Sequence, residues 1–227
     1  MKIHVFGCSL SHGIWWDKFM PEYKFNINAV PAGDNTTQSR RFQDLVINDQ
    51  LDENDFVLWQ VTYPGRMGFR LSPEHHFIKK NINKSDVVKN LHKAHYKNLL
   101  DDTTHLDYVA FNKEWYNTFY FVENVNQELQ QLLYNINIAN KMTSGKTLVW
   151  FAQADMFTDN RDIKFTNVLS HNNIDQLPLK DSIMTWAKEN NVDMDKESLH
   201  PSPMSYKLYV DTKLKPKIDE NIKRNSE

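Results

Sequence analysis

Lys2-Ile3-His4-Val5-Phe6-Gly7-Cys8-Ser9-Leu10-Ser11 is the stretch that decides the fold. Lys2–Phe6 is short and rich in β-prone residues, which predicts a buried strand. Gly-Cys-Ser then forms a turn of small residues at the carboxyl end of that strand. In an open parallel sheet, ligands bind beyond the carboxyl ends of the strands. The stretch therefore places the hydroxyl of Ser9 at a position where function is expected.

The first third of the chain alternates strand and helix. The pattern predicts a helix over Ile14–Met20, a strand over Lys24–Val30, a helix over Thr36–Asn48 and a strand over Asp55–Val61. Such alternation favours crossover connections and a parallel sheet. We expect a three-layer α/β sandwich, flavodoxin-like, with a parallel sheet of four to five strands and helices on both faces.

The remaining chain extends this pattern as a single domain over residues 1–227. Residues 67–110 fit the alternation poorly and predict a helical insertion or lid. After it we expect a helix over 115–142 capped by Gly145, a strand over Thr147–Phe151, an edge strand over Asp162–Val168, a helix over Leu179–Glu189 and a final helix over Pro203–Asn221.

Composition limits the classes of function. With 27 basic and 29 acidic residues the formal charge is −2, so no basic excess points to nucleic acid. Cys8 is the sole cysteine, which excludes an intrachain disulfide and a cysteine-rich zinc site. The N-terminus lacks the apolar core of a signal peptide, and no apolar run reaches the roughly 20 residues of a membrane span. We expect a cytoplasmic or virion-associated protein without a membrane partner.

A serine hydroxyl becomes a nucleophile when a base removes its proton and an acid orients that base. The candidate base is His200, in Glu197-Ser198-Leu199-His200-Pro201. The carboxylate three residues before it can turn toward the imidazole. The spacing is common by chance, so a solvated loop histidine is the alternative interpretation of this segment taken alone.

Together, the two segments resemble the SGNH (GDSL-type) hydrolase family. Gly7–Ser11 stands where that family has Gly-Asp-Ser-Leu-Ser, and Ala32-Gly33-Asp34-Asn35 is similar to its second block. Val57–Thr62 stands where its third block has an apolar strand followed by Gly-x-Asn, and Glu197–Pro201 where it has Asp-x-x-His-Pro. The resemblance covers the chain nearly end to end. The form that begins Phe-Gly-Cys-Ser is similar to proteins common in phage genomes.

The resemblance implies a Ser9–His200–Glu197 triad, with Asp195 as the second candidate for the acid. It implies an oxyanion hole made by the backbone N–H groups of Ser9 and Gly33. Thr62 stands at the position of the family's asparagine donor, and Asn35 is the alternative donor. Cys8 replaces an aspartate that braces the turn in the family.

The implied activity is hydrolysis of an ester, with an O-acetyl group on a carbohydrate as the leading substrate, and no cofactor. An acyltransferase that uses the same triad is one alternative. A non-catalytic binding or virion protein with a degenerate site is the other.

Further residues carry open interpretations. Arg66, Tyr63 and Trp15 are candidate substrate-binding residues. The alternative interpretation is an exposed surface residue for the arginine and core packing for the two aromatic residues. Cys8 is interpreted as a small buried residue of the turn, with a role as nucleophile as the weaker alternative. His12 is interpreted as an exposed or packing histidine, with a role as a second base as the weaker alternative. The histidines at 75, 76, 92 and 95 lack an acidic or cysteine partner motif, so we expect no metal site.

Overall fold

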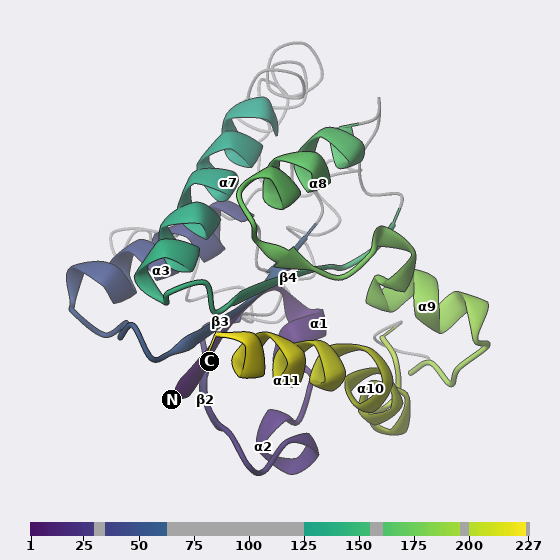
Figure 1. Cartoon of the computed structure of the whole chain (residues 1–227). Helices are drawn as coiled ribbons and strands as arrows, with labels where there is room; N and C mark the ends of the chain where they lie inside the picture. Colours follow the sequence, from purple (N-terminus) through teal and green to yellow (C-terminus); the bar gives the residue numbers. More distant parts are fainter. Residues whose placement is uncertain (30–34, 63–124, 155–160, 196–199, 226–227) are drawn as a thin grey trace, which may run out of the picture.

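A computed structural model describes residues 1–29, 35–62, 125–154, 161–195 and 200–225 (Figure 1). Its centre is a parallel sheet of five strands in the order β2-β1-β3-β4-β5. The strands are β1 (Lys2–Phe6), β2 (Lys24–Ile27), β3 (Phe56–Val61), β4 (Thr147–Phe151) and β5 (Asp175–Gln176). This is the flavodoxin-like order, and it confirms the predicted fold class.

Helices cover both faces of the sheet, which gives three layers (Figure 1). One face is covered by α3 (Asn35–Ile47), α7 (Val125–Met142) and α8 (Arg161–His171). The other is covered by α2 (Trp16–Phe19), α9 (Ile183–Glu189), α10 (Pro203–Tyr209) and α11 (Lys215–Arg224). A short helix, α1 (Ser9–His12), follows β1 directly.

Strand β3 runs through the middle of the core, and all six of its residues are buried. Phe56 and Leu58 pack into the layer that contains α9–α11, whereas Val57, Trp59 and Val61 pack into the layer that contains α3, α7 and α8. Burial on both faces explains why the strand reads as a continuous apolar run. Each such side chain stabilises the fold by about 1.5–3 kcal/mol.

The edge strand predicted at Asp162–Val168 is wrong, because these residues belong to helix α8. Phe165 and Leu169, four positions apart, are buried, whereas Val168 is exposed. That is the period of an amphipathic helix rather than of a strand. The edge of the sheet is formed instead by the two residues of β5.

Several predicted elements are present with other bounds. The predicted 14–20 helix is only α2, and the second strand ends at Ile27. The 179–189 helix is interrupted at Ser182, between a 3-10 turn over Leu179–Asp181 and α9. The predicted insertion at 67–110, and the first ten residues of the helix predicted at 115–142, lie outside the described residues.

The last helical segment contains a π-helical turn, Val210–Leu214, between α10 and α11. Pro216, the second residue of α11, explains it. Proline has no N–H and its ring crowds the carbonyl four residues earlier, which belongs to Thr212 in the π turn. The segment therefore continues to Arg224 as one rod that covers β4.

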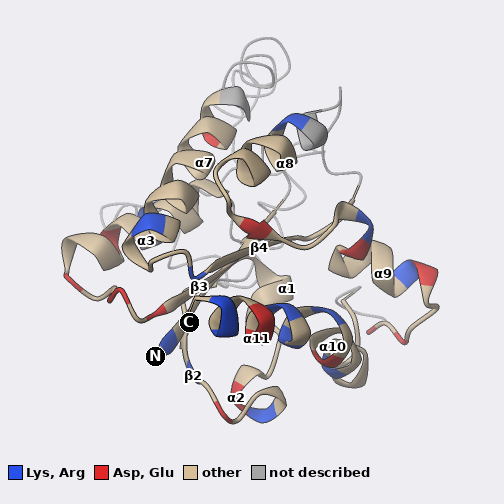
Figure 2. Cartoon of the chain, viewed as in Figure 1, with Lys and Arg blue, Asp and Glu red and all other residues tan. Residues whose placement is uncertain are grey.

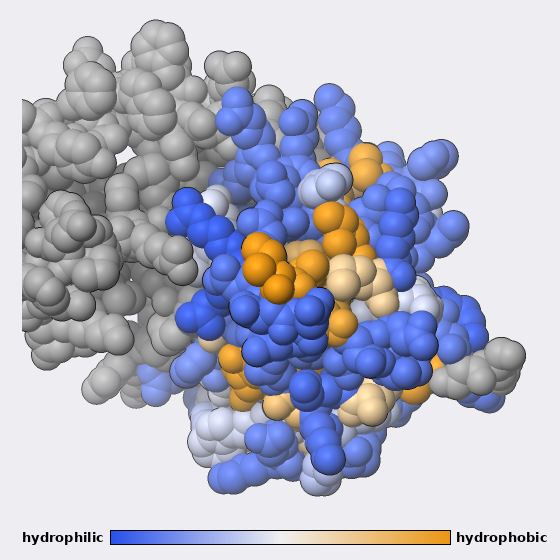
Figure 3. Space-filling view, turned by 90° about the vertical axis from the view of Figure 1, so that its left-hand side faces the viewer, coloured by the Kyte–Doolittle hydropathy of each residue, from blue (hydrophilic) through white to orange (hydrophobic). Residues whose placement is uncertain are grey.

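The described surface is polar. Along α10 and α11, Lys207 pairs with Asp211 and Lys215 with Asp219, so both signs of charge are interspersed (Figure 2). The face shown in Figure 3 is mostly hydrophilic, with a hydrophobic group near its centre and smaller ones above and below it. Of the helices in the described ranges, none has the length and apolar character needed to cross a bilayer.

Candidate active site

The Ser9 turn lies at the carboxyl end of β1. Cys8 is the extended N-cap residue of α1 and is buried, and Ser9 is the first helical residue. Ser9 itself is half-buried, so its hydroxyl is at the surface of the turn rather than in the core. Sequence reasoning placed this serine correctly at the strand end.

Gly7 is required by close approach. A Cβ atom at this position would lie 2.1 Å from Oγ of Ser11 and 2.8 Å from Oε1 of Gln60. Real Cβ contacts are never this short, so the turn folds as it does only without a side chain at position 7. This accounts for glycine in the first motif in physical terms.

His200 reaches Ser9 across the sheet edge. Its Nε2 atom lies 3.2 Å from Oγ of Ser9, although the two residues are 191 positions apart. The backbone of this segment is tied to residues 193–195: the Asp195 N–H donates to the His200 carbonyl at 2.7 Å, and the Ser202 N–H donates to the Asp193 carbonyl at 2.9 Å. These main-chain bonds fix the position from which the imidazole reaches the serine.

The acid of the predicted triad is not located. Glu197 lies outside the described residues. Asp195 is exposed and is joined to His200 through its backbone. The assignment of Glu197, with Asp195 as the second candidate, stays a prediction.

Asn35 and Thr62 come together at the carboxyl end of β3. The Thr62 N–H donates to Oδ1 of Asn35 at 3.0 Å, and Nδ2 of Asn35 donates to the Thr62 carbonyl at 3.1 Å. The second hydrogen of Nδ2 bonds Oε1 of Glu128, in α7, at 2.8 Å. Asn35 therefore clamps the backbone N–H and carbonyl of Thr62. Since both of its amide hydrogens are engaged, Asn35 would have to release one of these bonds before it could donate to an oxyanion.

The roles of the oxyanion residues stay predictions. Gly33, Tyr63 and Arg66 lie outside the described residues. Thr62 is fully buried, and the Ser9 turn is at the same edge of the sheet.

Trp15 and His12 are both exposed beyond the turn. Trp15 is 49% exposed, and Nζ of Lys18 lies 4.2 Å from the centre of its ring. One face of the ring is therefore covered by an ammonium group. Cys8, by contrast, is 1% exposed, which agrees with the packing interpretation of that residue.

Gln60 was missed by sequence reasoning. It is fully buried in β3, and its Oε1 accepts from the Cys8 N–H at 3.2 Å, from Cys8 Sγ at 3.2 Å and from Ser11 Oγ at 2.9 Å. The signal that could have found it is a polar residue inside the apolar run Phe56–Val61, which predicts a specific partner for the buried amide.

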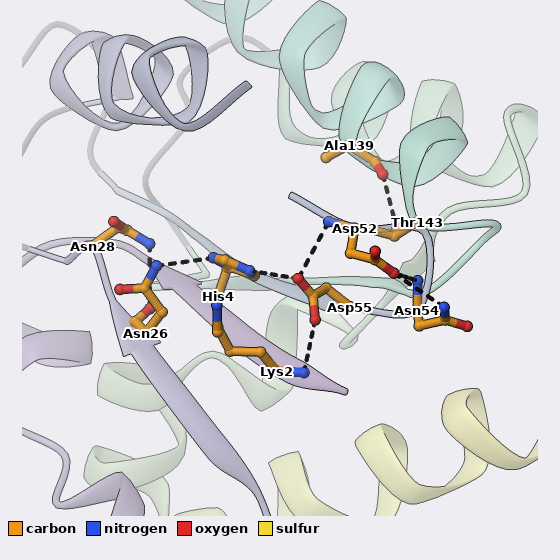
Figure 4. Close-up of polar contacts among 9 residues, drawn as sticks. All are labelled: Lys2, His4, Asn26, Asn28, Asp52, Asn54, Asp55, Ala139 and Thr143. Carbon is orange, nitrogen blue, oxygen red and sulfur yellow. Dashed lines mark hydrogen bonds and ion pairs between the residues drawn. The ribbon is translucent and has the colours of Figure 1, made fainter. Parts of the chain in front are cut away.

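A histidine–carboxylate pair lies at the opposite end of the strands from Ser9 (Figure 4). Nε2 of His4 lies 3.0 Å from Oδ2 of Asp55, and Nδ2 of Asn26 lies 3.1 Å from Nδ1 of His4. The Lys2 N–H donates to Oδ1 of Asp55 at 2.8 Å. The network is fully buried at His4 and links β1, β2 and the residue that precedes β3.

Two hollows, of about 800 and 580 Å³, also lie at the amino ends of the strands. Gly145 and Asp175 line the first, and Lys2 and Asp55 line the second. In sheets of this type ligands bind at the carboxyl edge, where Ser9 and His200 meet. Within the described ranges, no three His, Cys, Asp or Glu side chains gather as metal ligands would.

By sequence, the chain matches no known family and no curated protein. Similar solved structures include a member of the lipolytic protein G-D-S-L family from Veillonella parvula, with 12% identity, a TM-score of 0.46, and 95% of this chain and 97% of that chain covered. A lipase/acylhydrolase from Enterococcus faecalis has 11% identity and a TM-score of 0.48, with 99% and 97% covered. Protein YXIM from Bacillus subtilis has 9% identity and a TM-score of 0.47, with 99% of this chain but only 56% of that chain covered. Likenesses this distant leave function to be inferred from the site.

Proposed function

We propose that this protein is a serine esterase of the SGNH type, with Ser9 as nucleophile and His200 as base. The observation that carries the proposal is the 3.2 Å contact between Ser9 Oγ and His200 Nε2 at the carboxyl edge of the sheet. A serine and a histidine this far apart in sequence meet in a hydrogen bond of the length that proton transfer needs.

The mechanism follows from that contact. Nε2 of His200 accepts the Ser9 proton while Oγ attacks the acyl carbon, and the alkoxide of the ester takes this proton as it leaves. Water then attacks the acyl-enzyme, with His200 as base again, and releases the carboxylic acid. The steps need the tautomer of His200 with its proton on Nδ1, which an acid at that nitrogen stabilises; Glu197 is our assignment for it.

For the oxyanion we assign the backbone N–H groups of Ser9 and Gly33, with Thr62 at the third position. The clamp that Asn35 forms on Thr62 supports a fixed, rather than adaptable, geometry there. Donors held in place before reaction are the ones that stabilise a transition state most.

For the substrate we propose an O-acetyl group on a carbohydrate. The exposed Trp15, six positions after Ser9, supports this choice, because a sugar ring that displaces the Lys18 ammonium group can stack on the aromatic face. With an added sugar acceptor, acyl transfer in place of acid release would identify an acyltransferase instead.

Hydrolysis of p-nitrophenyl acetate tests the proposal. Ser9→Ala should lower kcat/KM by at least about a thousandfold, whereas Ser170→Ala, at an exposed serine of α8, should leave it unchanged. Full activity in Ser9→Ala would overturn the assignment of the nucleophile. No activity in the wild type would overturn the esterase proposal and favour a binding protein.

A further inference from the structure

We propose that Gln60 is the positioning residue of the Ser9 turn: its side-chain oxygen holds the residues on both sides of the nucleophile, so that Oγ stays within reach of His200. The role in catalysis rests on the proposed esterase function. The role in holding the turn is independent of that function.

The contacts of Gln60 are all with the turn. Oε1 accepts from the backbone N–H and the thiol of Cys8, at 3.2 Å each, and from the hydroxyl of Ser11 at 2.9 Å. Cys8 directly precedes Ser9, and Ser11 follows it by two positions. Oε1 of Gln60, in the neighbouring strand, therefore fixes the residues before and after the nucleophile.

The orientation of the amide is fixed by chemistry. A backbone N–H can only donate, so the atom that faces Cys8 N must be the oxygen. Nε2 then has no hydrogen-bond partner among the described residues, although it is buried. An apolar side chain would avoid that penalty. The three bonds to Oε1 offset it, which indicates that the oxygen is the useful part of this side chain.

The side chain of Gln60 is buried, and the three bonds to its oxygen all come from the turn. Its effect must pass through the turn, and Gly7 leaves the space that lets the amide approach. A displaced nucleophile slows the chemical step without changing substrate binding. Loss of the oxygen should therefore change kcat and leave KM in place.

Gln60→Met keeps the size of the side chain and removes the acceptor. We expect kcat for p-nitrophenyl acetate to fall about 10- to 100-fold, with KM within about twofold. Gln60→Glu keeps an acceptor oxygen and should recover most of the loss. Gln38→Met is the matched control, because Gln38 is also a fully buried glutamine and neither of its amide atoms has a partner among the described residues.

Cys8 supplies a readout that does not need activity. It is the chain's sole cysteine and is 1% exposed, so alkylation by iodoacetamide under native conditions reports opening of the turn. We expect Gln60→Met to speed alkylation at least about tenfold, beyond what its global free energy of unfolding accounts for, and Gln38→Met to leave it unchanged.

The two readouts separate the two proposals. If the wild type neither hydrolyses the ester nor reacts with a fluorophosphonate, the esterase proposal fails, and faster alkylation in Gln60→Met still supports the hold on the turn. If Cys8 is alkylated at the wild-type rate in Gln60→Met, the inference is overturned whatever the kcat of the variant. Any loss of kcat would then not come from a displaced turn. Faster alkylation with an unchanged kcat in an active enzyme overturns the positioning role.

Discussion

Oγ of Ser9 lies 3.2 Å from Nε2 of His200, and the two residues reach this distance from opposite ends of the chain. Ser9 follows the first strand, and His200 precedes the last helical segment. They are 191 positions apart, and strands β2–β5 lie between them in the sequence. The contact therefore exists only when the fold brings β1 and the segment around His200 together, and activity should be lost together with the global fold.

The triad acid can be identified by paired substitutions. Glu197→Gln should lower kcat by roughly a hundredfold or more, since a histidine without its acid loses the productive tautomer. Asp195→Asn changes an exposed side chain and should leave kcat within about a factor of three. Steady-state kinetics on both variants decides the assignment, and the reverse pattern would transfer the role to Asp195.

Asn35→Ala should destabilise the protein by about 2–4 kcal/mol. It removes both bonds to the peptide of Thr62 and the bond to Glu128, and buried polar groups that lose partners cost about 1–3 kcal/mol each. Urea unfolding measures the change. Asn48→Ala, at an exposed asparagine just after the same helix, serves as control and should stay within about 0.5 kcal/mol of wild type. Equal losses in both variants would contradict the clamp.

Gly7→Ala and Gly13→Ala should differ sharply. A Cβ at position 7 would lie 2.1 Å from Oγ of Ser11, whereas at position 13 the nearest atom is the Ser9 carbonyl oxygen at 3.2 Å. Overpacking of the first kind typically costs about 3 kcal/mol, and the second kind about 1 kcal/mol or less. Urea unfolding of the two variants checks this, and a Gly7→Ala protein with wild-type stability would show that the turn has another conformation.

Stability should fall as the solution is acidified. Burial lowers the pKa of His4, against the opposing effect of Asp55, so the unfolded chain takes up a proton near pH 6.5 that the folded protein does not. The free energy of unfolding therefore decreases below about pH 6.5, by up to about 1.4 kcal/mol per pH unit for one proton.

Asp55 lowers the free energy of unfolding further at lower pH. Burial opposes ionisation of its carboxyl group, but the hydrogen bonds from His4, Lys2 and Asp52 hold its pKa below the usual range. Its contribution is therefore present above about pH 4 and disappears below it as the group is protonated. Urea unfolding between pH 8 and 3 measures both.

The variant that separates the two contributions is His4→Gln, which keeps a donor toward Asp55 and does not titrate. It should flatten the dependence between pH 7 and 5 and leave the loss below pH 4. His171→Gln, at an exposed position, is the control and should keep the wild-type slope. An unchanged slope in His4→Gln would place the proton uptake on another group.

The parts of the fold that sequence predicts are those buried on both sides. β3 and β4 read as continuous apolar runs and were found within one residue of their bounds. Helix α8 was mistaken for a strand, because alternating apolar residues over a few positions fit both periods, and only the buried pair Phe165 and Leu169 distinguishes them.

Some residues of the candidate site could likewise be predicted from the sequence, and others could not. Ser9 and His200 were predicted from motifs, because a nucleophile and its base must be particular residue types. Gln60 was not, because its role depends on how closely β3 approaches the turn, a three-dimensional distance that no local pattern encodes. The clamp between Asn35 and Thr62 is similar: the asparagine was recognised, but its hydrogen-bond partners follow from packing.

The most direct test of the account is labelling with a fluorophosphonate, followed by mass spectrometry of the modified peptide. The reaction requires the nucleophile, its base and the oxyanion donors together. We predict one label per chain, on Ser9, with loss of labelling in His200→Ala and full labelling in His12→Ala. Absence of label from the folded wild-type protein, or a label on a serine other than Ser9, would contradict the central claim.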